Sequence, residues 1–143
     1  MTLNVTIRSC RPDECAAILD LWRDAGSIPS VSDSVDVLER HLQKDDNLLL
    51  VAEHDNLLLG TIMGGWDGWR GNIYRLAVLP DYRRQGIGRA LVQEVERRLL
   101  LKGTRRISIC VAREEDSAID FWDALKDMNY ERDHRIIRYV KSL

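Results

Sequence analysis

The sequence predicts an α+β fold in which helices flank a mostly antiparallel sheet. Runs of alternating or continuous apolar residues interchange with runs of helical spacing, in the order β-α-α-β-β-β-α-β-α-β. Two of the strands are joined by the short turn Asp55-Asn56, which is typical of an antiparallel hairpin. The chain has 143 residues and contains no repeat, low-complexity segment or linker, so we expect a single domain over residues 1–143.

The first half of the chain contains three strands and two helices by this interpretation. Residues 5–9, 48–52 and 57–65 read as strands. A helix starts near Pro12 and ends at Gly26. Either Ser32 or Asp33 is expected to cap the second helix. The apolar faces of the two helices are Cys15, Ile18, Leu19 and Trp22, then Val35, Val37, Leu38 and Leu42.

The second half supplies the remaining elements. Residues 73–78 and 106–111 read as strands, residues 116–126 as a helix, and Tyr130 with residues 136–140 as one or two last strands. A long helix runs from Ile87 to about Lys102-Gly103. The prediction is therefore a sheet of six to seven strands with about four helices.

Composition limits the possible functions. The net charge of -2 argues against broad nucleic-acid binding, which usually needs a basic face. The three cysteines, Cys10, Cys15 and Cys110, are odd in number and form no CxxC pair, so we expect neither a disulfide framework nor a metal site. Cys110 is predicted to be a buried strand residue. The sequence shows no signal peptide and no membrane span, so we expect a cytoplasmic protein that binds no membrane.

Residues 76–91 form the most informative stretch. An apolar run stops at Pro80, and Gly86 and Gly88 precede a long helix. The start of a helix presents unpaired N–H groups and the positive end of the helix dipole. Three cations, Arg83, Arg84 and Arg89, lie in the same stretch. The combination favours a phosphate or pyrophosphate site over a turn with merely solvated arginines.

Two common phosphate loops do not fit this stretch. The dinucleotide fingerprint G-x-G-x-x-G would need a glycine where Leu91 stands, and residues 107–111 lack the acidic residue that it requires. The P-loop needs four residues between its glycines, but only Ile87 separates Gly86 from Gly88.

The stretch resembles the signature of the GNAT superfamily of N-acetyltransferases, which is Arg or Gln, two residues, Gly, one residue, then Gly or Ala. Residues 83–88 fit it in full, and the order of elements over nearly the whole chain is also similar. Residues 60–71 resemble a small bacterial subgroup, the YpeA-like acetyltransferases. The resemblance implies a GNAT-like fold with splayed central strands and acetyl-CoA as co-substrate.

The resemblance also implies which residues bind the co-substrate. The amides of residues 84–90 would bind the pyrophosphate, and the strand at residues 76–78 would pair with the pantetheine arm. The resulting set is Leu76, Ala77, Val78, Arg83, Arg84, Gln85, Gly86, Ile87, Gly88, Arg89, Ala90 and Trp122.

The catalytic residues are left unassigned. Trp122 stands where many family members have a tyrosine that protonates the CoA thiolate, and an indole N–H cannot replace a phenol there. Tyr74 and Tyr130 are candidate acids, although each is more simply explained as a packed or surface tyrosine. Glu53 and Asp67 are candidate bases, although an exposed carboxylate is the simpler interpretation of both.

On the acceptor side the resemblance points to Trp22, Trp66 and Trp69. Core packing is favoured for Trp22. Trp66 and Trp69 have about equal odds of contacting the acceptor and of being ordinary loop residues. The leading hypothesis is direct transfer of an acetyl group from acetyl-CoA to a primary amine of a small molecule or protein. The alternative is a non-catalytic acyl-CoA-binding regulatory module. A homodimer is compatible with either hypothesis.

Overall fold

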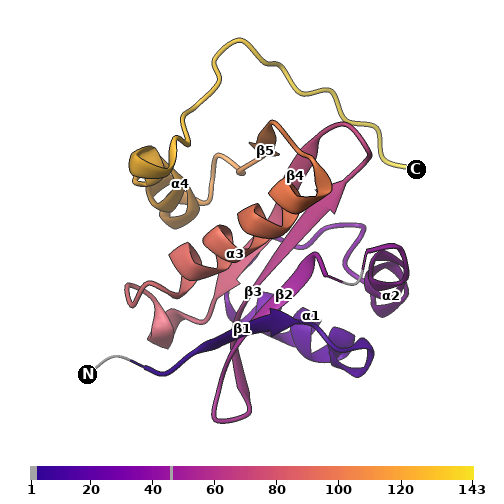
Figure 1. Ribbon diagram of the computed structural model, residues 1–143, viewed down its shortest axis with the longest axis vertical. Helices are drawn as coiled ribbons and strands as arrows, with labels where there is room; N and C mark the ends of the chain where they lie inside the picture. Colours follow the sequence, from indigo (N-terminus) through magenta and orange to yellow (C-terminus); the bar gives the residue numbers. More distant parts are fainter. Residues whose placement is uncertain (1–2, 46) are drawn as a thin grey trace. The chain divides into compact units, whose positions relative to one another are not determined.

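The computed structural model describes residues 3–45 and 47–143, which fall into two compact units, one ending at Ile109 and one starting at Cys110. The first unit contains a sheet and three α-helices (Figure 1). Its elements are β1 (Thr6–Ser9), α1 (Cys15–Asp24), α2 (Val35–Lys44), β2 (Leu49–His54), β3 (Leu57–Trp66), β4 (Gly71–Val78), α3 (Ile87–Lys102) and β5 (Ile107–Ile109). The second unit contains α4 (Asp116–Asp123) and a 3₁₀ turn at Leu125–Met128.

The sheet has the strand order β1-β2-β3-β4-β5. The first three pairs are antiparallel, and β4 pairs with β5 in parallel. The β2–β3 hairpin turns at Asp55 and Asn56, both at positive φ (48° and 65°), as the hairpin signal predicted. β5 pairs only with residues 71–73, so β4 runs on past the end of this pairing. The pairing ends where β5 itself ends, and the expected parting of the central strands stays a prediction.

Helices cover the two faces of this sheet. The cluster on one face joins α1 and α2 to β2 and β4, and consists of Cys10, Cys15, Ile18, Leu21, Trp22, Leu38, Leu42, Leu49, Val51 and Ala77. On the other face α3 packs closely on β3, because a Cβ at Gly64 would lie 2.8 Å from a methyl of Val95. Figure 1 shows α3 lying in front of the strands. The glycines of β3 therefore set the distance between sheet and helix.

Buried polar groups tie α1 to the sheet. The indole Nε1 of Trp22 donates to the hydroxyl of Thr61 on β3 at 2.8 Å, and both residues are buried. Arg75 of β4 lies over the ring of Trp22 and donates to both carboxylate oxygens of Asp33 at 2.7–2.8 Å. Trp22 is thus a core residue, as favoured from its place on a helical apolar face.

The predicted six to seven strands were too many. Within the described residues the sheet has five strands, and it is mostly antiparallel as predicted, with one parallel pair between β4 and β5. Residues 136–140 form no strand, and Ile136, Ile137, Tyr139 and Val140 are exposed. A strand needs a partner for its backbone, and alternation in the sequence does not show whether such a partner exists.

Three local predictions were also wrong. Ser34, rather than Ser32 or Asp33, caps α2 by accepting from the N–H of Val37, because the carboxylate of Asp33 is paired with Arg75. Leu21, which the predicted apolar face omits, is buried on α1, whereas Leu19 is only partly buried against the same cluster. Cys110 is exposed, since β5 ends one residue before it. Asn129 ends the last helical turn at a φ of 66°, a left-handed conformation that asparagine tolerates.

None of the helices in the described part of the chain is both long and apolar enough to cross a membrane.

Candidate functional site

The glycine turn between β4 and α3 has a fixed, unusual backbone. Pro80–Tyr82 forms a 3₁₀ turn, and Arg83 is extended. Arg84 and Gly86 both have positive φ, at 63° and 83°. Gly86 is the residue that precedes α3, and it carries no side chain that could cap the helix. A Cβ at Gly86 would meet nothing within 4 Å, so a side chain would not clash there. Glycine is favoured at this position because of the positive φ.

The turn therefore ends in uncapped N–H groups. The first bond of α3 runs from the N–H of Ala90 to the carbonyl of Gly86, at 3.0 Å. The N–H groups of Gly86, Ile87 and Gly88 precede that bond and have no carbonyl within the helix to reach. Oriented donors at the positive end of a 16-residue helix are suited to a phosphate group.

The arginines of the turn have different roles. Arg83 donates through Nε to the carbonyl of Val78 at 2.9 Å and through Nη2 to that of Ala25 at 2.7 Å. Its guanidinium therefore fastens the turn to the ends of β4 and α1. Arg84 is exposed, and Arg89 is half-buried in the first turn of α3. The sequence predicted three cations for the anion site. In the structure Arg83 instead holds the turn in place through its bonds to two backbone carbonyls.

The end of β4 is bonded to a strand on one side only. Leu76, Ala77 and Val78 lie opposite Ile62, Thr61 and Gly60 of β3. The pairing with β5 stops at Ile73. The backbone of residues 76–78 thus has one edge beyond β5 that can bond to an extended, peptide-like group.

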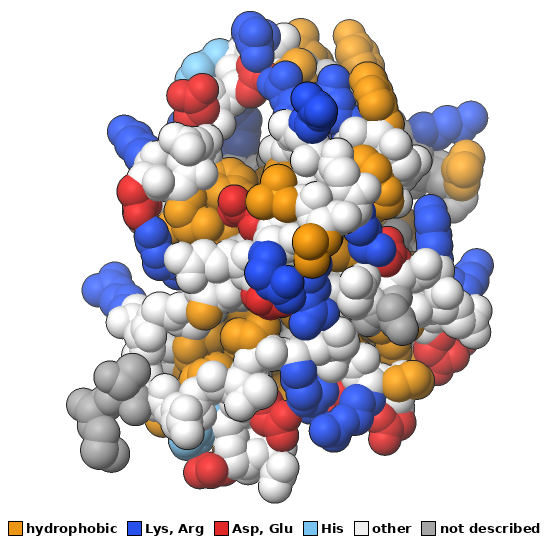
Figure 2. Space-filling model, viewed as in Figure 1, with side chains coloured by type: hydrophobic (Ala, Val, Ile, Leu, Met, Phe, Trp, Pro, Cys, Tyr) orange, Lys and Arg blue, Asp and Glu red, His pale blue; other side chains and the backbone are white. Residues whose placement is uncertain are grey.

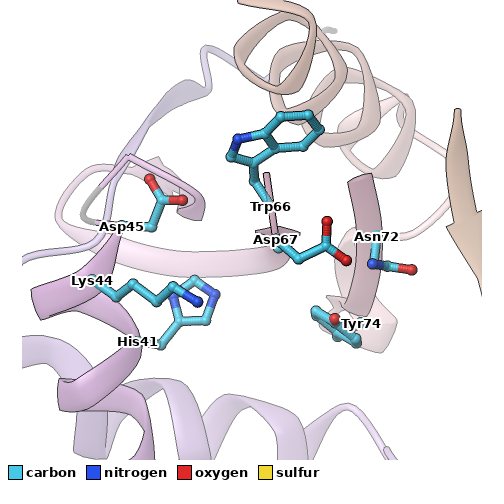
Figure 3. A pocket seen from close by; sticks show the side chains of 8 residues that line it. His41, Lys44, Asp45, Trp66, Asp67, Asn72 and Tyr74 are labelled. Carbon is cyan, nitrogen blue, oxygen red and sulfur yellow. The ribbon is translucent and has the colours of Figure 1, made fainter. Parts of the chain in front are cut away.

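A cavity of about 180 Å³ opens beside β4, on the side of α2 (Figure 3). α2 and the residue after it, the end of β3 with its loop, and β4 all contribute side chains. The lining residues are His41, Lys44, Asp45, Gly65, Trp66, Asp67, Asn72 and Tyr74. Trp66, Asp67 and Tyr74 were candidates from the sequence. His41, Lys44, Asp45 and Asn72 were missed, and nothing in the local pattern marks them.

A bulge in β4 places Tyr74 in this cavity. Met63 pairs with Arg75 and Gly64 with Ile73, which leaves Tyr74 as the extra residue. A Cβ at Gly65 would lie 2.5 Å from the ring of Tyr74. The absence of a side chain at Gly65 therefore allows the tyrosine ring to lie over β3.

The loop between β3 and β4 orients Asp67. One carboxylate oxygen accepts from the backbone N–H groups of Trp69 and Arg70, both at 2.7 Å. These bonds, the one from Arg70 first, lower the pKa of Asp67 and keep it ionised. Trp69 is exposed, and the guanidinium of Arg70 lies 4.2 Å from its ring centre. Of the two loop tryptophans, only Trp66 lines the cavity.

His41 has an unusual set of partners. Its Nε2 lies 2.8 Å from the carbonyl oxygen of Gly64. A carbonyl only accepts, so this nitrogen carries a proton and the other, Nδ1, presents a lone pair when the ring is neutral. Nδ1 is buried and has no hydrogen-bond partner among the described residues. Such a group costs about 1–3 kcal/mol unless something satisfies it.

The remaining candidates lie elsewhere. Glu53 is ion-paired with Arg8 at 2.6 Å and is largely buried, so it is not the exposed carboxylate expected. Trp122, in the second unit, contacts the rings of Phe121 and Tyr130 at centroid distances of 5.2 Å. Tyr130 is thereby accounted for as a packed residue.

Two observations concern metal ions and nucleic acids. Within residues 3–45 and 47–143 no group of three metal-ligating side chains comes together. On the face shown in Figure 2, basic and acidic side chains are interspersed, unlike the uniform basic surface of most nucleic-acid binders.

Proteins of similar sequence are named acetyltransferases. An acetyltransferase of Pectobacterium atrosepticum is 36% identical over 120 residues, which cover 84% of this chain and 85% of that protein. An acetyltransferase of Sodalis glossinidius is 35% identical over 137 residues, with 96% and 94% covered.

Solved structures share the fold at low identity. The PaiA N-acetyltransferase of Thermoplasma acidophilum, in complex with coenzyme A, has a TM-score of 0.75 at 20% identity and covers 86% of this chain and 89% of its own. The aminoglycoside N-acetyltransferase AAC(6')-Iy has a TM-score of 0.72 at 18% identity, with 100% and 98% covered. The ribosomal-protein-S18-alanine N-acetyltransferase of Escherichia coli has 0.69 at 22%, with 85% and 76% covered.

The profile of the Acetyltransferase (GNAT) family matches residues 15–126, which include both the glycine turn and the residues that line the cavity. The chain belongs to the GNAT family of acetyltransferases.

Proposed function

We propose that this acetyltransferase moves an acetyl group from acetyl-CoA directly to a primary amine. The observation that carries the proposal is the glycine turn, in which Gly86, at positive φ and without a capping side chain, directly precedes the first N–H groups of α3. These groups are in place before any ligand arrives, so an anion can bind without ordering flexible side chains. A pyrophosphate is the anion that the family membership suggests.

The donor site in this proposal extends from the turn along β4. The N–H groups of residues 84–88 would hold the pyrophosphate, with Arg84 and Arg89 as nearby cations, because the N–H of Ala90 already donates to the carbonyl of Gly86. The edge of Leu76–Ala77–Val78 that has no strand partner would hold the pantetheine arm, with the carbonyl of Val78 already accepting from Nε of Arg83. Arg83 contributes by fastening the turn, and the assignment of Trp122 to this site is based on the family resemblance alone.

The acceptor site in this proposal is the cavity beside α2. Tyr74 lies two residues before Leu76 on β4, which is about 7 Å along a strand. An amine in the cavity would therefore be close to the end of the proposed pantetheine site. A cavity of about 180 Å³ is smaller than typical drug-sized pockets, so it suits a small amine or the end of a longer chain.

The chemistry requires that an amine lose a proton and that a thiolate leave. The acetyl group of acetyl-CoA is bound to sulfur, so the leaving group is a thiolate. The thiol of free cysteine has a pKa of about 8.5, and a thiolate of similar basicity can leave without help from a strong acid. Tyr74 is the candidate hydroxyl that lies at the cavity. Asp67, kept ionised by the loop, can attract the ammonium form of the amine.

Binding and turnover can be tested separately. Acetyl-CoA at 100 times its dissociation constant should stabilise the fold by about 2.7 kcal/mol, visible as a higher Tm. Release of free thiol across a panel of amines then reports transfer. A chain that binds acetyl-CoA but releases no thiol with any amine would favour the non-catalytic module, which the tryptophan at position 122 suggests. No stabilisation by acetyl-CoA or CoA would contradict both proposals.

A further inference from the structure

We propose that the cavity beside α2 selects an acceptor that carries both an ammonium and a carboxylate, which is a small free amino acid. Lys44 would bind the carboxylate, and Asp67 would bind the ammonium. The inference rests on the proposed acetyl transfer and adds the class of acceptor. It depends on the charges around the cavity, on their placement relative to β4, and on the size of the cavity.

Among the described residues, ammonium and carboxylate groups are balanced around the cavity. Lys44, Asp45 and Asp67 line it, and Lys102 is joined to Asp45 by an ion pair of 2.7 Å. Asp45 and Lys102 therefore neutralise each other, which leaves one cation and one anion for a ligand. A ligand with a single charge would leave one of these two groups without a counter-ion, whereas a zwitterion pairs with both.

Lys44 is available to a ligand. It is the last residue of α2, and Figure 3 shows its side chain extending from the helix toward the cavity. No hydrogen bond or ion pair occupies its ammonium within residues 3–45 and 47–143. An ammonium group has three donors and no acceptor, and its single positive charge matches the single negative charge of a carboxylate.

Asp67 has one carboxylate oxygen left for a ligand. The backbone N–H groups of Arg70 and Trp69 both donate to Oδ1, at 2.7 Å each. These bonds lower the pKa of Asp67, so the carboxylate keeps its charge at neutral pH. The guanidinium of Arg70 lies over the ring of Trp69 and is not part of the cavity lining. Oδ2 of Asp67 can therefore accept from an ammonium that enters the cavity.

The placement of the two charges gives the acceptor a direction. Figure 3 shows Lys44 on the side of α2, and Asp67 with Asn72 and Tyr74 on the side of β4. In the proposed donor site the pantetheine arm lies along β4 at residues 76–78. An amino acid held by both charges would turn its ammonium toward β4 and its carboxylate toward α2. The nitrogen is then the end nearer to the acetyl group, as the reaction requires.

Size limits the side chain of the acceptor. Cavities of about 150 Å³ accommodate benzene, and the cavity here has about 180 Å³. Alanine has as many heavy atoms as benzene, so glycine, alanine and serine are of suitable size. The first residue of a peptide would place an uncharged amide where Lys44 calls for a carboxylate. The proposal thus favours free amino acids over amides and peptide N-termini.

The test compares each of these three amino acids with its amide, which has the same shape and lacks the negative charge. Thiol release by the full chain gives kcat/KM for the acid and the amide. Their ratio is compared between variants, so that the intrinsic reactivity of each amine cancels. Lys44→Met should lower the acid-to-amide ratio by about fivefold or more, mainly through a higher KM for the acid.

Two further variants frame this result. Lys44→Arg keeps the positive charge and should keep the ratio within about twofold of that of the unchanged chain. Arg40→Met is the matched control, because Arg40 is an exposed cation on the same helix that does not line the cavity. Lys44 is exposed as well, so both methionine variants should melt at the temperature of the unchanged chain.

Asp67→Asn separates the two charges. Its amide oxygen can still accept from the loop N–H groups while the negative charge is lost. Acid and amide carry the same ammonium, so kcat/KM should fall by a similar factor for both and leave their ratio unchanged. A fall for only one of the two contradicts the role of Asp67.

The remaining outcomes separate the acceptor class from the proposed function. An acid-to-amide ratio of Lys44→Met within twofold of that of Arg40→Met overturns the carboxylate site. Acetylation of the amides but of none of the three amino acids overturns the acceptor class and leaves the proposed acetyl transfer standing. Absence of transfer to every amine, with acetyl-CoA still raising the Tm, contradicts the proposed function and this inference with it.

Discussion

Replacing Gly86 by alanine tests the donor site through the backbone alone. A Cβ at this position would touch nothing within 4 Å, so the cost comes from holding a non-glycine residue at a φ of 83°. The left-handed conformation costs an L-residue about 1–2 kcal/mol, which lowers the Tm of a chain of this length by roughly 2–8 °C. Any relaxation that relieves the strain rotates the N–H groups at the start of α3.

The expected effect on binding is larger than the effect on stability. A hydrogen bond to a charged group contributes about 1.5–3 kcal/mol, so misdirecting one donor should weaken acetyl-CoA binding about tenfold or more. Isothermal titration calorimetry measures this directly. Gly103→Ala is the matched control, because Gly103 ends the same helix at a φ of 106° and a Cβ there also meets nothing within 4 Å.

The two variants should lose similar stability, and only Gly86→Ala should lose affinity. If Gly86→Ala binds acetyl-CoA as tightly as Gly103→Ala does, the N–H groups of the turn are not ligands of the pyrophosphate. The donor site would then lie elsewhere in the molecule.

Two further predictions concern the fold. Trp22→Phe removes the buried donor to the hydroxyl of Thr61 and should lower the free energy of unfolding by about 1–3 kcal/mol in urea titrations; an unchanged midpoint and slope would contradict this role. Pairing first with Arg97 and then with Arg98 lowers the pKa of Glu94 from 4.5 to about 2, so its contribution is present above pH 4.5 and is lost as the pH falls through 2. Glu94→Gln should therefore destabilise the protein by about 1 kcal/mol at pH 7, with a difference that shrinks below pH 4.5; a difference independent of pH would show that these ion pairs contribute nothing.

The turns were predictable because each depends on a few neighbouring residues. Asp55-Asn56 and Asn129 adopt positive φ as expected from their small polar side chains, and Gly86 does so as the residue that starts α3. The local spacing of apolar residues likewise predicted α3 from Ile87 to Lys102. In these elements the physical cause lies within the segment itself.

The side chains were less predictable because their roles depend on distant partners. The position of Asp33 before α2 predicts a helix cap, but its carboxylate accepts from Arg75, which lies 42 residues later in the chain. Arg83 reads as a ligand of the anion, but the carbonyl of Ala25 occupies part of its guanidinium. The ring of His41 bonds the carbonyl of Gly64, 23 residues later in the chain, and the residues around His41 do not indicate this contact.

The two halves of the proposed site are therefore encoded differently. The donor half is built from backbone groups whose directions depend on a glycine at positive φ, and substitutions of neighbouring side chains leave those directions intact. The acceptor half depends on side chains from α2, the loop after β3 and the bulge of β4, any of which can change without altering the turn. This separation explains how a single fold can keep one co-substrate while its acceptors diverge, as the names of the structural neighbours illustrate. If the cavity beside α2 is the acceptor site, as we propose, substitutions of its lining residues should change acceptor choice and leave acetyl-CoA binding intact.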